Sequence, residues 1–269
     1  MFNEIVIVRG GGDLASGTIQ KLHRSGFRVL VLEASKPTAI RRKISFSEVV
    51  YEREIEVEGI RAVHVFSLSE IENAWSNKKV PVIIDEEGKY IKEIKPKIVV
   101  DAIIAKKNMG TTRDMADITI AIGPGFTAGK DVDVVIETAR GHNLGRLIFS
   151  GQAAKNTGVP GNIRGYSKER VIHSICAGVM KDVLDIGAVV EKDEVIAYIG
   201  ETPIKATISG LLRGIIRSGS TVKEGFKIAD IDPRVSEKMN CYTISDKARN
   251  IAGGVLEAVF YLMTSQNED

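Results

Sequence analysis

The first third of the chain alternates short apolar runs with amphipathic segments. Residues 4–9 and 28–33 are apolar almost throughout, which is typical of strands buried on both faces. Between them, residues 13–25 carry apolar side chains at helical spacing, and Gly26 stands where a helix commonly ends. The pattern predicts a β-loop-α-β unit whose two strands are parallel neighbours in one sheet.

Further apolar runs predict more strands of the same sheet. Residues 54–65 alternate with period two on both sides of Glu58-Gly59, as a β-hairpin does. Residues 67–77 have the spacing of a helix. Short buried strands are expected at 80–85, 98–101, 118–122 and 134–138. Residues 1–150 are therefore predicted to form one α/β domain with a doubly wound parallel sheet.

The second half of the chain contains an internal repeat. Residues 151–170 are rich in Gly, Asn and Ser and are predicted to connect two domains. Residues 177–181 resemble residues 209–213, at an offset of 32. Each copy is predicted to form strand, glycine turn and strand, and the two copies to sandwich into a small β module over 171–235. Residues 236–269 end in an amphipathic helix that is expected to pack back on the domains.

Composition narrows the class of protein. The chain is 43% hydrophobic and 27% charged, as globular proteins are, and Lys+Arg exceed Asp+Glu by only 37 − 35 = 2, which argues against a nucleic-acid partner. No apolar run approaches the ~20 residues that span a bilayer, and the N-terminus does not resemble a secretory signal. Two cysteines make no disulfide framework. We therefore expect a cytoplasmic protein without a membrane partner.

The first glycine loop follows the first predicted strand. The pattern Gly10-x-Gly12-x-x-Ala15 fits the dinucleotide-binding fingerprint, in which glycines allow a tight turn and a close approach to a pyrophosphate. Glu33 ends the next strand, where an acid would bond a ribose hydroxyl. The alternative is a turn that only packs, and Asp13 would repel a phosphate or cap the helix. The cofactor-binding residues predicted here are Gly10, Gly11, Gly12, Asp13, Ala15 and Glu33.

A second glycine loop begins at Gly123. It resembles a Walker A loop, but Pro124 replaces a required glycine and Asp131 a required Ser or Thr, which argues against a P-loop NTPase. Ligands bind at the carboxyl ends of parallel strands, so this loop is a second candidate, and a plain turn is the alternative. The cofactor-binding residues predicted here are Gly123, Gly125, Phe126 and Thr127.

Polar side chains follow the next predicted strand. Arg140 and Arg146 carry guanidinium groups that suit carboxylate or phosphate oxygens, so both are predicted to bind the cofactor. His142 could move a proton near neutral pH, or be an ordinary loop histidine. The catalytic candidates are His142, Arg140 and Asp101, which ends an earlier strand. The four histidines are not spaced as metal ligands are, so no metal site is predicted. The sequence also contains no recognisable catalytic triad or pair of catalytic acids, so whether the protein is an enzyme stays open.

Longer motifs resemble known families. Residues 171–234 are similar to a biotinyl/lipoyl-type barrel-sandwich module. Six longer motifs stand out along the chain: RGGGDLASG (9–17), FSEVVY (46–51), GPGFTAGKDV (123–132), ETARGHNLGR (137–146), TGVPGNI (157–163) and ISDKARNIAGGVLEA (244–258). With these motifs the chain resembles, over nearly its whole length, the YqeB family of selenium-dependent molybdenum hydroxylase system proteins, and its N-terminal half is similar to XdhC-type Rossmann domains.

The resemblance implies an accessory role in maturing molybdenum hydroxylases that carry a labile selenium. The protein would bind a nucleotide such as NAD(P), or the molybdenum cofactor, as a small anionic ligand at the sheet edge, and its partner would be a hydroxylase. One alternative is an NAD(P)-dependent oxidoreductase with Glu33 on the ribose. Another is a non-catalytic scaffold whose β module grips the hydroxylase.

Overall fold

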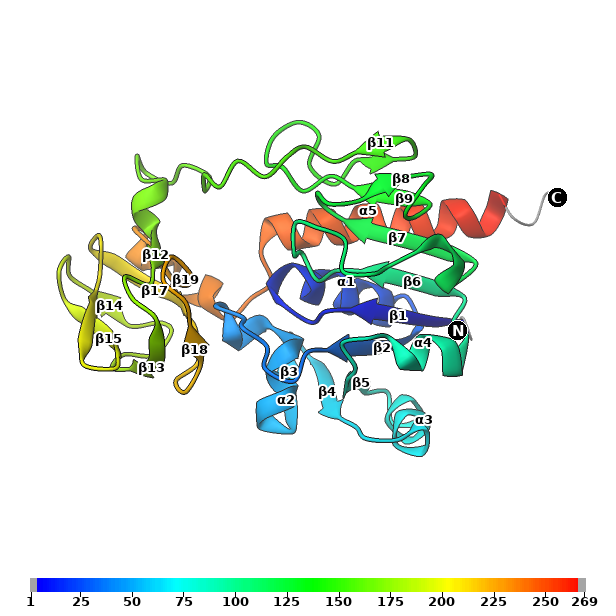
Figure 1. Ribbon diagram of the computed structural model, residues 1–269, viewed down its shortest axis with the longest axis horizontal. Helices are drawn as coiled ribbons and strands as arrows, with labels where there is room; N and C mark the ends of the chain where they lie inside the picture. Colours follow the sequence, from blue (N-terminus) through cyan, green and yellow to red (C-terminus); the bar gives the residue numbers. More distant parts are fainter. Residues whose placement is uncertain (1–3, 266–269) are drawn as a thin grey trace. The chain divides into compact units, whose positions relative to one another are not determined.

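The computed structural model describes residues 4–265, which form two compact units (Figure 1). Of these residues, unit 1 contains 4–37, 46–156 and 244–265, and unit 2 contains 38–45 and 157–243. The sequence placed residues 38–45 in the N-terminal domain. They belong to unit 2, where the Ile215 N–H donates to the Ile40 carbonyl oxygen at 3.0 Å.

Unit 1 is built on a nine-stranded sheet (Figure 1). In spatial order its strands are β10 (Leu147–Ile148), β9 (Val134–Ile136), β7 (Ile118–Ile122), β6 (Ile98–Asp101), β1 (Ile5–Arg9), β2 (Arg28–Glu33), β5 (Val80–Ile84), β4 (Ile60–His64) and β3 (Glu54–Val57). Strands β1 and β2 are parallel neighbours, which confirms the predicted β-loop-α-β unit.

The sheet is mixed rather than parallel throughout, which corrects the predicted fold class. All strands from β9 to β4 run parallel, but the edge strands β10 and β3 run antiparallel to their neighbours. Strand β3 is antiparallel because the predicted turn at Glu58-Gly59 joins it to β4 as a hairpin. Strand β10 returns along β9 through the loop 137–146.

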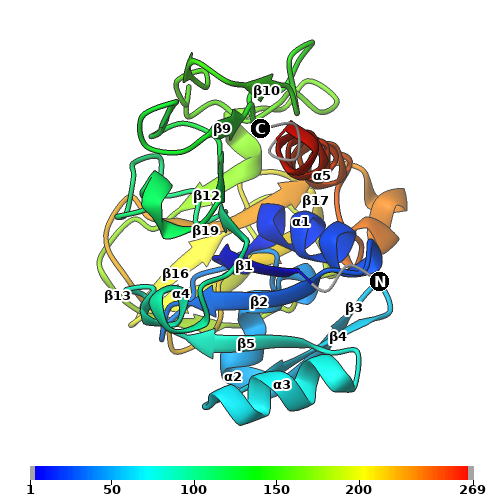
Figure 2. The same cartoon turned by 90° about the vertical axis from the view of Figure 1, so that its right-hand side faces the viewer.

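Helices cover both faces of the sheet. Helices α1 (Asp13–Arg24) and α5 (Asp246–Ser265) lie side by side on one face (Figure 2). Helices α3 (Leu68–Ser76) and α4 (Lys89–Ile94) lie on the other face, where Ile71 and Ile91 pack with Ile7 and Leu30 in one core cluster. The remaining helix, α2 (Val49–Glu52), is a single turn between the 3-10 turn η2 (Phe46–Glu48) and β3.

Helix α5 covers a part of the sheet that has no crossover helix of its own. Between β6 and β9 the chain forms only the 3-10 turn η3 (Arg113–Met115), strand β7 and the short strand β8 (Thr127–Ala128), which pairs with β11 (Gly151–Gln152). The apolar stripe of α5, which includes the fully buried Ile251, Val255 and Val259, packs beside β7 and β9. The C-terminal segment therefore completes the layer that α1 begins. No helix within residues 4–265 is long and apolar enough to cross a membrane.

Helices α1 and α5 run parallel and very close together. A Cβ atom on Gly17 would lie 2.6 Å from the Ala248 carbonyl oxygen, and the Phe27 and Phe260 rings have centroids 6.0 Å apart. Gly17 and Ala248 lie near the starts of the two helices, whereas Phe27 follows the end of α1 and Phe260 lies near the end of α5, so the two helices begin at the same edge of the sheet. The N-terminus of α5 is capped by the Ser245 hydroxyl, which accepts the Ala248 N–H at 3.2 Å, whereas that of α1 has no side-chain cap.

Replacing Gly17 with alanine is expected to destabilise unit 1 by about 1–3 kcal/mol, because the methyl group forces α1 away from Ala248. Urea unfolding followed by the fluorescence of Trp75 measures this, since Trp75 is the one tryptophan of the chain and belongs to unit 1. Gly253→Ala is the matched control: its methyl would meet only the Lys21 amine, at 3.8 Å, so it should be neutral or stabilising. Equal effects of the two substitutions would show that the α1–α5 contact is not tight.

Unit 2 consists mainly of two four-stranded antiparallel sheets. One has the order β12 (Val171–His173), β19 (Lys227–Asp232), β17 (Gly210–Ile215) and β14 (Val189–Val190). The other has the order β16 (Thr202–Lys205), β15 (Val195–Ile199), β13 (Gly178–Asp182) and β18 (Thr221–Val222). Their buried side chains form a single apolar cluster. The 3-10 turns η1 (Arg42–Ile44), η4 (Lys168–Arg170) and η5 (Val235–Cys241) complete the unit.

The predicted repeat is present in the strands of unit 2. Strands β13 and β17 begin 32 residues apart, at Gly178 and Gly210, and so do β14 and β18 and also β15 and β19. The predicted arrangement of the copies is wrong, because each copy does not form its own layer. Each sheet takes two strands from each copy, so that β17 and β19 pair with β12 and β14. Because strands of the two copies pair with each other, backbone N–H and C=O groups form hydrogen bonds that would stay unpaired at the edges of two separate hairpins.

Candidate functional site

The loops that carry most of the predicted site residues meet at the carboxyl edge of the sheet of unit 1. Strands β1, β6, β7 and β9 are neighbours and parallel, so the loops that follow them lie at one edge. The first glycine loop follows β1 and the second follows β7, with only β6 between them. Two strand spacings correspond to about 10 Å. The two glycine loops therefore lie on the same side of unit 1.

The first glycine loop is held by its neighbours at two of its three glycines. Gly10 has φ of +92°, and a Cβ there would lie 3.0 Å from the Ala102 carbonyl oxygen. A Cβ on Gly11 would lie 2.9 Å from the Ser47 nitrogen. Packing therefore explains Gly10 and Gly11, whereas a Cβ on Gly12 would meet nothing within 4 Å.

Gly12 is the N-cap of α1, and no side chain caps the helix. Asp13, the first residue of α1, is therefore not the cap that the sequence offered as an alternative, and Ala15 is buried in the helix–sheet contact. The N–H groups of the first turn have no acceptor within the helix. The N-terminus of α1 is thus an open set of donors at the positive end of the helix dipole.

Glu33 lies directly against the first glycine loop. Its Oε2 accepts the Gly11 N–H at 2.7 Å, and its Oε1 accepts the Ala34 N–H at 2.7 Å. Burial raises the pKa of Glu33, the two N–H donors oppose this, and the nearby Glu86 and Glu48 carboxylates raise it further. The carboxylate positions the loop, and its remaining lone pairs are available to a hydroxyl donor.

The second glycine loop is largely explained by packing. Gly125 has φ of +113°, and a Cβ there would lie 2.7 Å from the Lys107 Cα. The Phe126 side chain is buried with Val132 and Val135, so its predicted contact with a cofactor is corrected to a core contact. The Thr127 N–H donates to Asp131 Oδ2 at 2.8 Å. Gly123 donates its N–H to the Ile136 carbonyl oxygen at 2.9 Å, which ties the loop to β9.

Asp101 is enclosed rather than exposed to a ligand. It is 2% exposed, and its Oδ2 accepts the Thr111 hydroxyl at 2.6 Å and lies 3.9 Å from Arg9 Nη1. The Ile103 N–H donates to its Oδ1 at 3.2 Å. Burial raises the pKa of Asp101, against the hydrogen bonds and the Arg9 charge. Asp101 therefore links β6, β1 and the following loop, and does not face solvent as a catalytic acid would.

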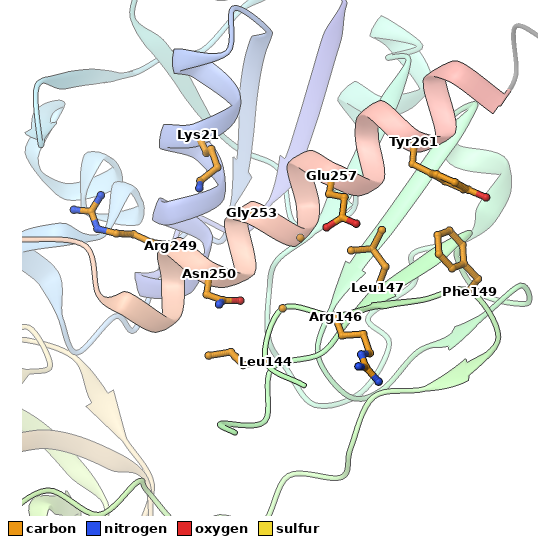
Figure 3. Close-up of a pocket in the computed structure, with 12 residues that line it drawn as sticks. Lys21, Leu144, Arg146, Leu147, Phe149, Arg249, Asn250, Gly253, Glu257 and Tyr261 are labelled. Carbon is orange, nitrogen blue, oxygen red and sulfur yellow. The ribbon is translucent and has the colours of Figure 1, made fainter. Parts of the chain in front are cut away.

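The polar residues predicted to act together after β9, namely Arg140, His142 and Arg146, do not all lie at one place in the structure. Arg140 is exposed and pairs with Asp246 of α5 at 3.3 Å, which brings it to the sheet edge. His142 is exposed in the same loop. Arg146 lies apart from both, in a groove along α5 (Figure 3). Glu137 is held by the N–H groups of Thr138, Ala139 and Ala154.

Lys247 is the residue at this edge that sequence reasoning missed. It is the second residue of α5, and the charges of Arg140, Asp13, Glu137 and Asp246 act on its amine. Its pKa is lowered from the ordinary value, first by burial and next by Arg140, while the three carboxylates act in the opposite direction. The docking of α5 on α1 brings the charge of this amine within reach of Asp13, which follows the first glycine loop. Within the described residues, no group of three or more His, Cys, Asp or Glu side chains could hold a metal ion.

The sequence of the chain is similar to that of one curated protein, which is uncharacterised. No protein-family profile matches the chain. An uncharacterised protein of Escherichia coli (strain K12), YqeB, is 49% identical over 261 residues, which are 97% of this chain and 48% of that protein. The chain thus spans about half the length of the curated relative that it matches.

Solved structures with some likeness belong to other classes than expected. The ectoine utilization protein EutE (DoeB) of Ruegeria pomeroyi matches with a TM-score of 0.26 and 10% identity, over 85% of each chain. An aspartoacylase family protein of Mesorhizobium loti matches with a TM-score of 0.28 and 14% identity, over 86% of this chain and 85% of that one. A succinylglutamate desuccinylase of Silicibacter matches with a TM-score of 0.25 and 12% identity, over 85% and 84%.

These findings correct three expectations from the sequence. The matching structures are of ectoine-utilization, desuccinylase and aspartoacylase type, and none of those named is an XdhC-type Rossmann domain or a biotinyl/lipoyl module. The predicted parallel, Rossmann-like domain followed by a barrel-sandwich module is corrected by the mixed nine-stranded sheet of unit 1. The relative is uncharacterised, so the assignment to molybdenum hydroxylase maturation is replaced by similarity to a protein of unknown activity.

Proposed function

We propose that unit 1 binds a small phosphorylated ligand of nucleotide type at the carboxyl edge of its sheet, with a phosphate group at the N-terminus of α1. The observation that carries this proposal is the open helix end. Gly12 leaves free space in front of α1, and no side chain caps the unpaired N–H groups behind it. Such a helix end is suited to an anion because its N–H groups and its dipole point the same way.

Lys247 removes the main objection to an anion at this place. Asp13 stands in the first turn of α1 and would repel a phosphate, and the positive charge of Lys247, which interacts with the Asp13 carboxylate, offsets that repulsion. The other carboxylates nearby are also engaged, since Asp246 pairs with Arg140 and Glu137 accepts backbone N–H groups. The N–H donors of the first turn of α1 are left for the ligand.

Glu33 supports a ribose next to the phosphate. It ends β2 and touches the first glycine loop, which is where an acid bonds a ribose hydroxyl in dinucleotide sites. A ligand that joins ribose to a diphosphate, such as NAD(P) or a nucleoside diphosphate, would use both features. Titration of the purified protein with NAD, NADP, ATP, S-adenosylmethionine and molybdopterin identifies the best ligand, and no binding of any of them would contradict the proposal.

Gly12→Ala is expected to weaken the binding of ADP about tenfold or more, because its methyl group occupies the space that the phosphate needs. The same substitution should leave the stability of unit 1 nearly unchanged, since the new Cβ meets nothing within 4 Å and the φ of −70° suits alanine. Calorimetric titration with ADP, and with adenosine as the phosphate-free control, measures the effect. An unchanged ADP affinity in a stable Gly12→Ala protein would place the ligand elsewhere.

The affinity for ADP is expected to fall at alkaline pH as Lys247 loses its proton. Because the pKa of Lys247 is lowered, the fall begins below the ordinary lysine value of 10.5. Arg140, Asp13, Glu137 and Asp246 face this amine, and their charges do not change in that range. Lys247→Arg stays charged, so its affinity should persist to higher pH. Identical pH profiles of the two proteins would exclude Lys247 from the site.

We further propose that the protein acts in the cytoplasm. Cys176 and Cys241 are both free thiols in the structure, which agrees with a reducing compartment. Fractionation of cells followed by detection of the native chain tests this, and recovery from a compartment outside the cytoplasm would contradict it.

A further inference from the structure

The segments that follow β2 and β5 lie side by side at the carboxyl edge of unit 1, next to Glu33. Strands β2 and β5 are parallel neighbours (Figure 2), and Glu33 is the last residue of β2. The Glu33 carbonyl oxygen accepts the Asp85 N–H at 3.0 Å, which continues the pairing beyond the end of β5. The residue after Asp85 therefore leaves the sheet beside the place where the ribose of the ligand is proposed to bind.

That next residue, Glu86, joins the two segments. Its Oε1 accepts the Ser35 N–H at 3.1 Å and the Ser35 hydroxyl at 3.0 Å. These hydrogen bonds lower the pKa of Glu86, so its carboxylate is ionised at neutral pH. The backbone of Glu86 is held as well, because the buried Arg9 guanidinium donates to its carbonyl oxygen at 3.2 Å. An ionised carboxylate is thus fixed two residues beyond Glu33, on the side of β2 that faces β5.

The donors that Glu86 occupies are those that a phosphate would need at this place. Backbone N–H groups and serine hydroxyls are common partners of phosphate oxygens in proteins. Here both donors of Ser35 point to a single carboxylate oxygen of the chain itself. Lys36 follows Ser35 and is exposed, so a cation is also at hand. Without the Glu86 carboxylate, Ser35 and Lys36 would offer a phosphate two donors and a positive charge.

The negative charges around Glu33 repel a further anion. Burial raises the pKa of Glu33 most, and the charges of Glu86 and Glu48 raise it further, so both carboxylates act on this group. A phosphate on the ribose hydroxyl beside Glu33 would add about two more negative charges. Water screens like charges less where they are partly buried, so this repulsion persists at physiological salt.

From these contacts we infer that the site takes a ribose with a free 2′-hydroxyl, and that Glu86 is the residue that excludes a 2′-phosphate. The inference rests on the function proposed for the N-terminus of α1 and narrows its ligand class. Glu33 accepts the free hydroxyl, while Glu86 keeps the Ser35 donors occupied and repels a phosphate. The ligand is accordingly of the NAD or ADP kind and not of the NADP kind.

Calorimetric titration of the full chain with ADP and with 2′-phospho-ADP tests the inference, because the two compounds differ by one phosphate. The unchanged protein should bind ADP about tenfold or more tightly than 2′-phospho-ADP. Glu86→Ala should lower this ratio of affinities about tenfold or more, since it frees the Ser35 donors and removes a negative charge. Glu86→Gln loses the charge but keeps an acceptor for Ser35, so it should lower the ratio less.

Glu87→Ala is the matched control. It removes the same charge from the next residue of the loop, whose exposed carboxylate pairs only with the exposed Lys89, at 3.4 Å, among the described residues. This substitution should leave the ratio of affinities unchanged. The inference is overturned, and the proposed function stands, if the unchanged protein binds both compounds equally or if Glu86→Ala behaves like Glu87→Ala. If neither compound binds, the proposed function fails and the inference fails with it.

Discussion

Replacing Arg9 by methionine is expected to lower the free energy of unfolding of unit 1 by about 3–5 kcal/mol, because it leaves the Asp101 carboxylate buried without its cation. Arg9 and Asp101 end the neighbouring strands β1 and β6 and are 3% and 2% exposed. The Arg9 guanidinium donates to the Thr111 hydroxyl and to the Glu86 carbonyl oxygen. Thr111 in turn donates to Asp101. One buried chain of contacts thus fixes the floor of the site.

The stability lost on Arg9→Met should be smaller at acidic pH than at neutral pH. Burial raises the pKa of Asp101, so this carboxyl takes up a proton more readily in the folded protein than in the unfolded chain, and the cost of losing Arg9 shrinks as pH falls through that raised pKa. Urea unfolding followed by Trp75 fluorescence measures it. Adding Asp101→Asn to Arg9→Met should recover part of the stability, because it removes the stranded charge. A loss below about 1 kcal/mol for Arg9→Met would show that the pair is not buried as described.

Phe46→Ala is expected to cost about 3–5 kcal/mol, because it leaves a cavity in a closely packed core. Phe46 is fully buried, its N–H donates to Ser16 Oγ at 3.2 Å, and the next N–H, that of Ser47, donates to the Gly11 carbonyl oxygen at 2.9 Å. The cavity therefore opens behind the first glycine loop. Phe66→Ala is the matched control. That side chain is 55% exposed, so its loss should stay below about 1 kcal/mol in the same unfolding experiment. Similar losses for the two would contradict the core position of Phe46.

The local pattern of the chain was enough to predict the elements near the first glycine loop. The apolar run before Gly10, the helical spacing after it and the run that ends at Glu33 correspond to β1, α1 and β2. The turn at Glu58-Gly59 was also predicted, from the alternation with period two on both sides of it, and in the structure both residues have the positive φ that a two-residue hairpin turn requires. These features depend on neighbours in sequence.

Contacts between distant segments were not predictable in the same way. The apolar stripe along α5 predicted that this helix has a buried face, but not that Ala248 would pack against Gly17 of α1. The interaction between the Lys247 and Asp13 charges depends on that packing and could therefore not be predicted. The repeat located the strands of unit 2 but not their exchange between sheets, because both pairings bury the same apolar side chains. Phe126 was predicted at a binding loop although its apolar ring is better explained by burial.

The central claim is that a phosphate group binds at the N-terminus of α1. The most direct measurement is an NMR titration of the 15N-labelled protein with ADP, following the backbone amides of the first turn of α1. The account predicts that the amides of Asp13, Leu14 and Ala15 shift most, that adenosine leaves them in place, and that Gly12→Ala needs about tenfold or more ADP to reach the same shifts. Shifts confined to other parts of the chain, with these three amides unmoved at saturating ADP, would contradict it.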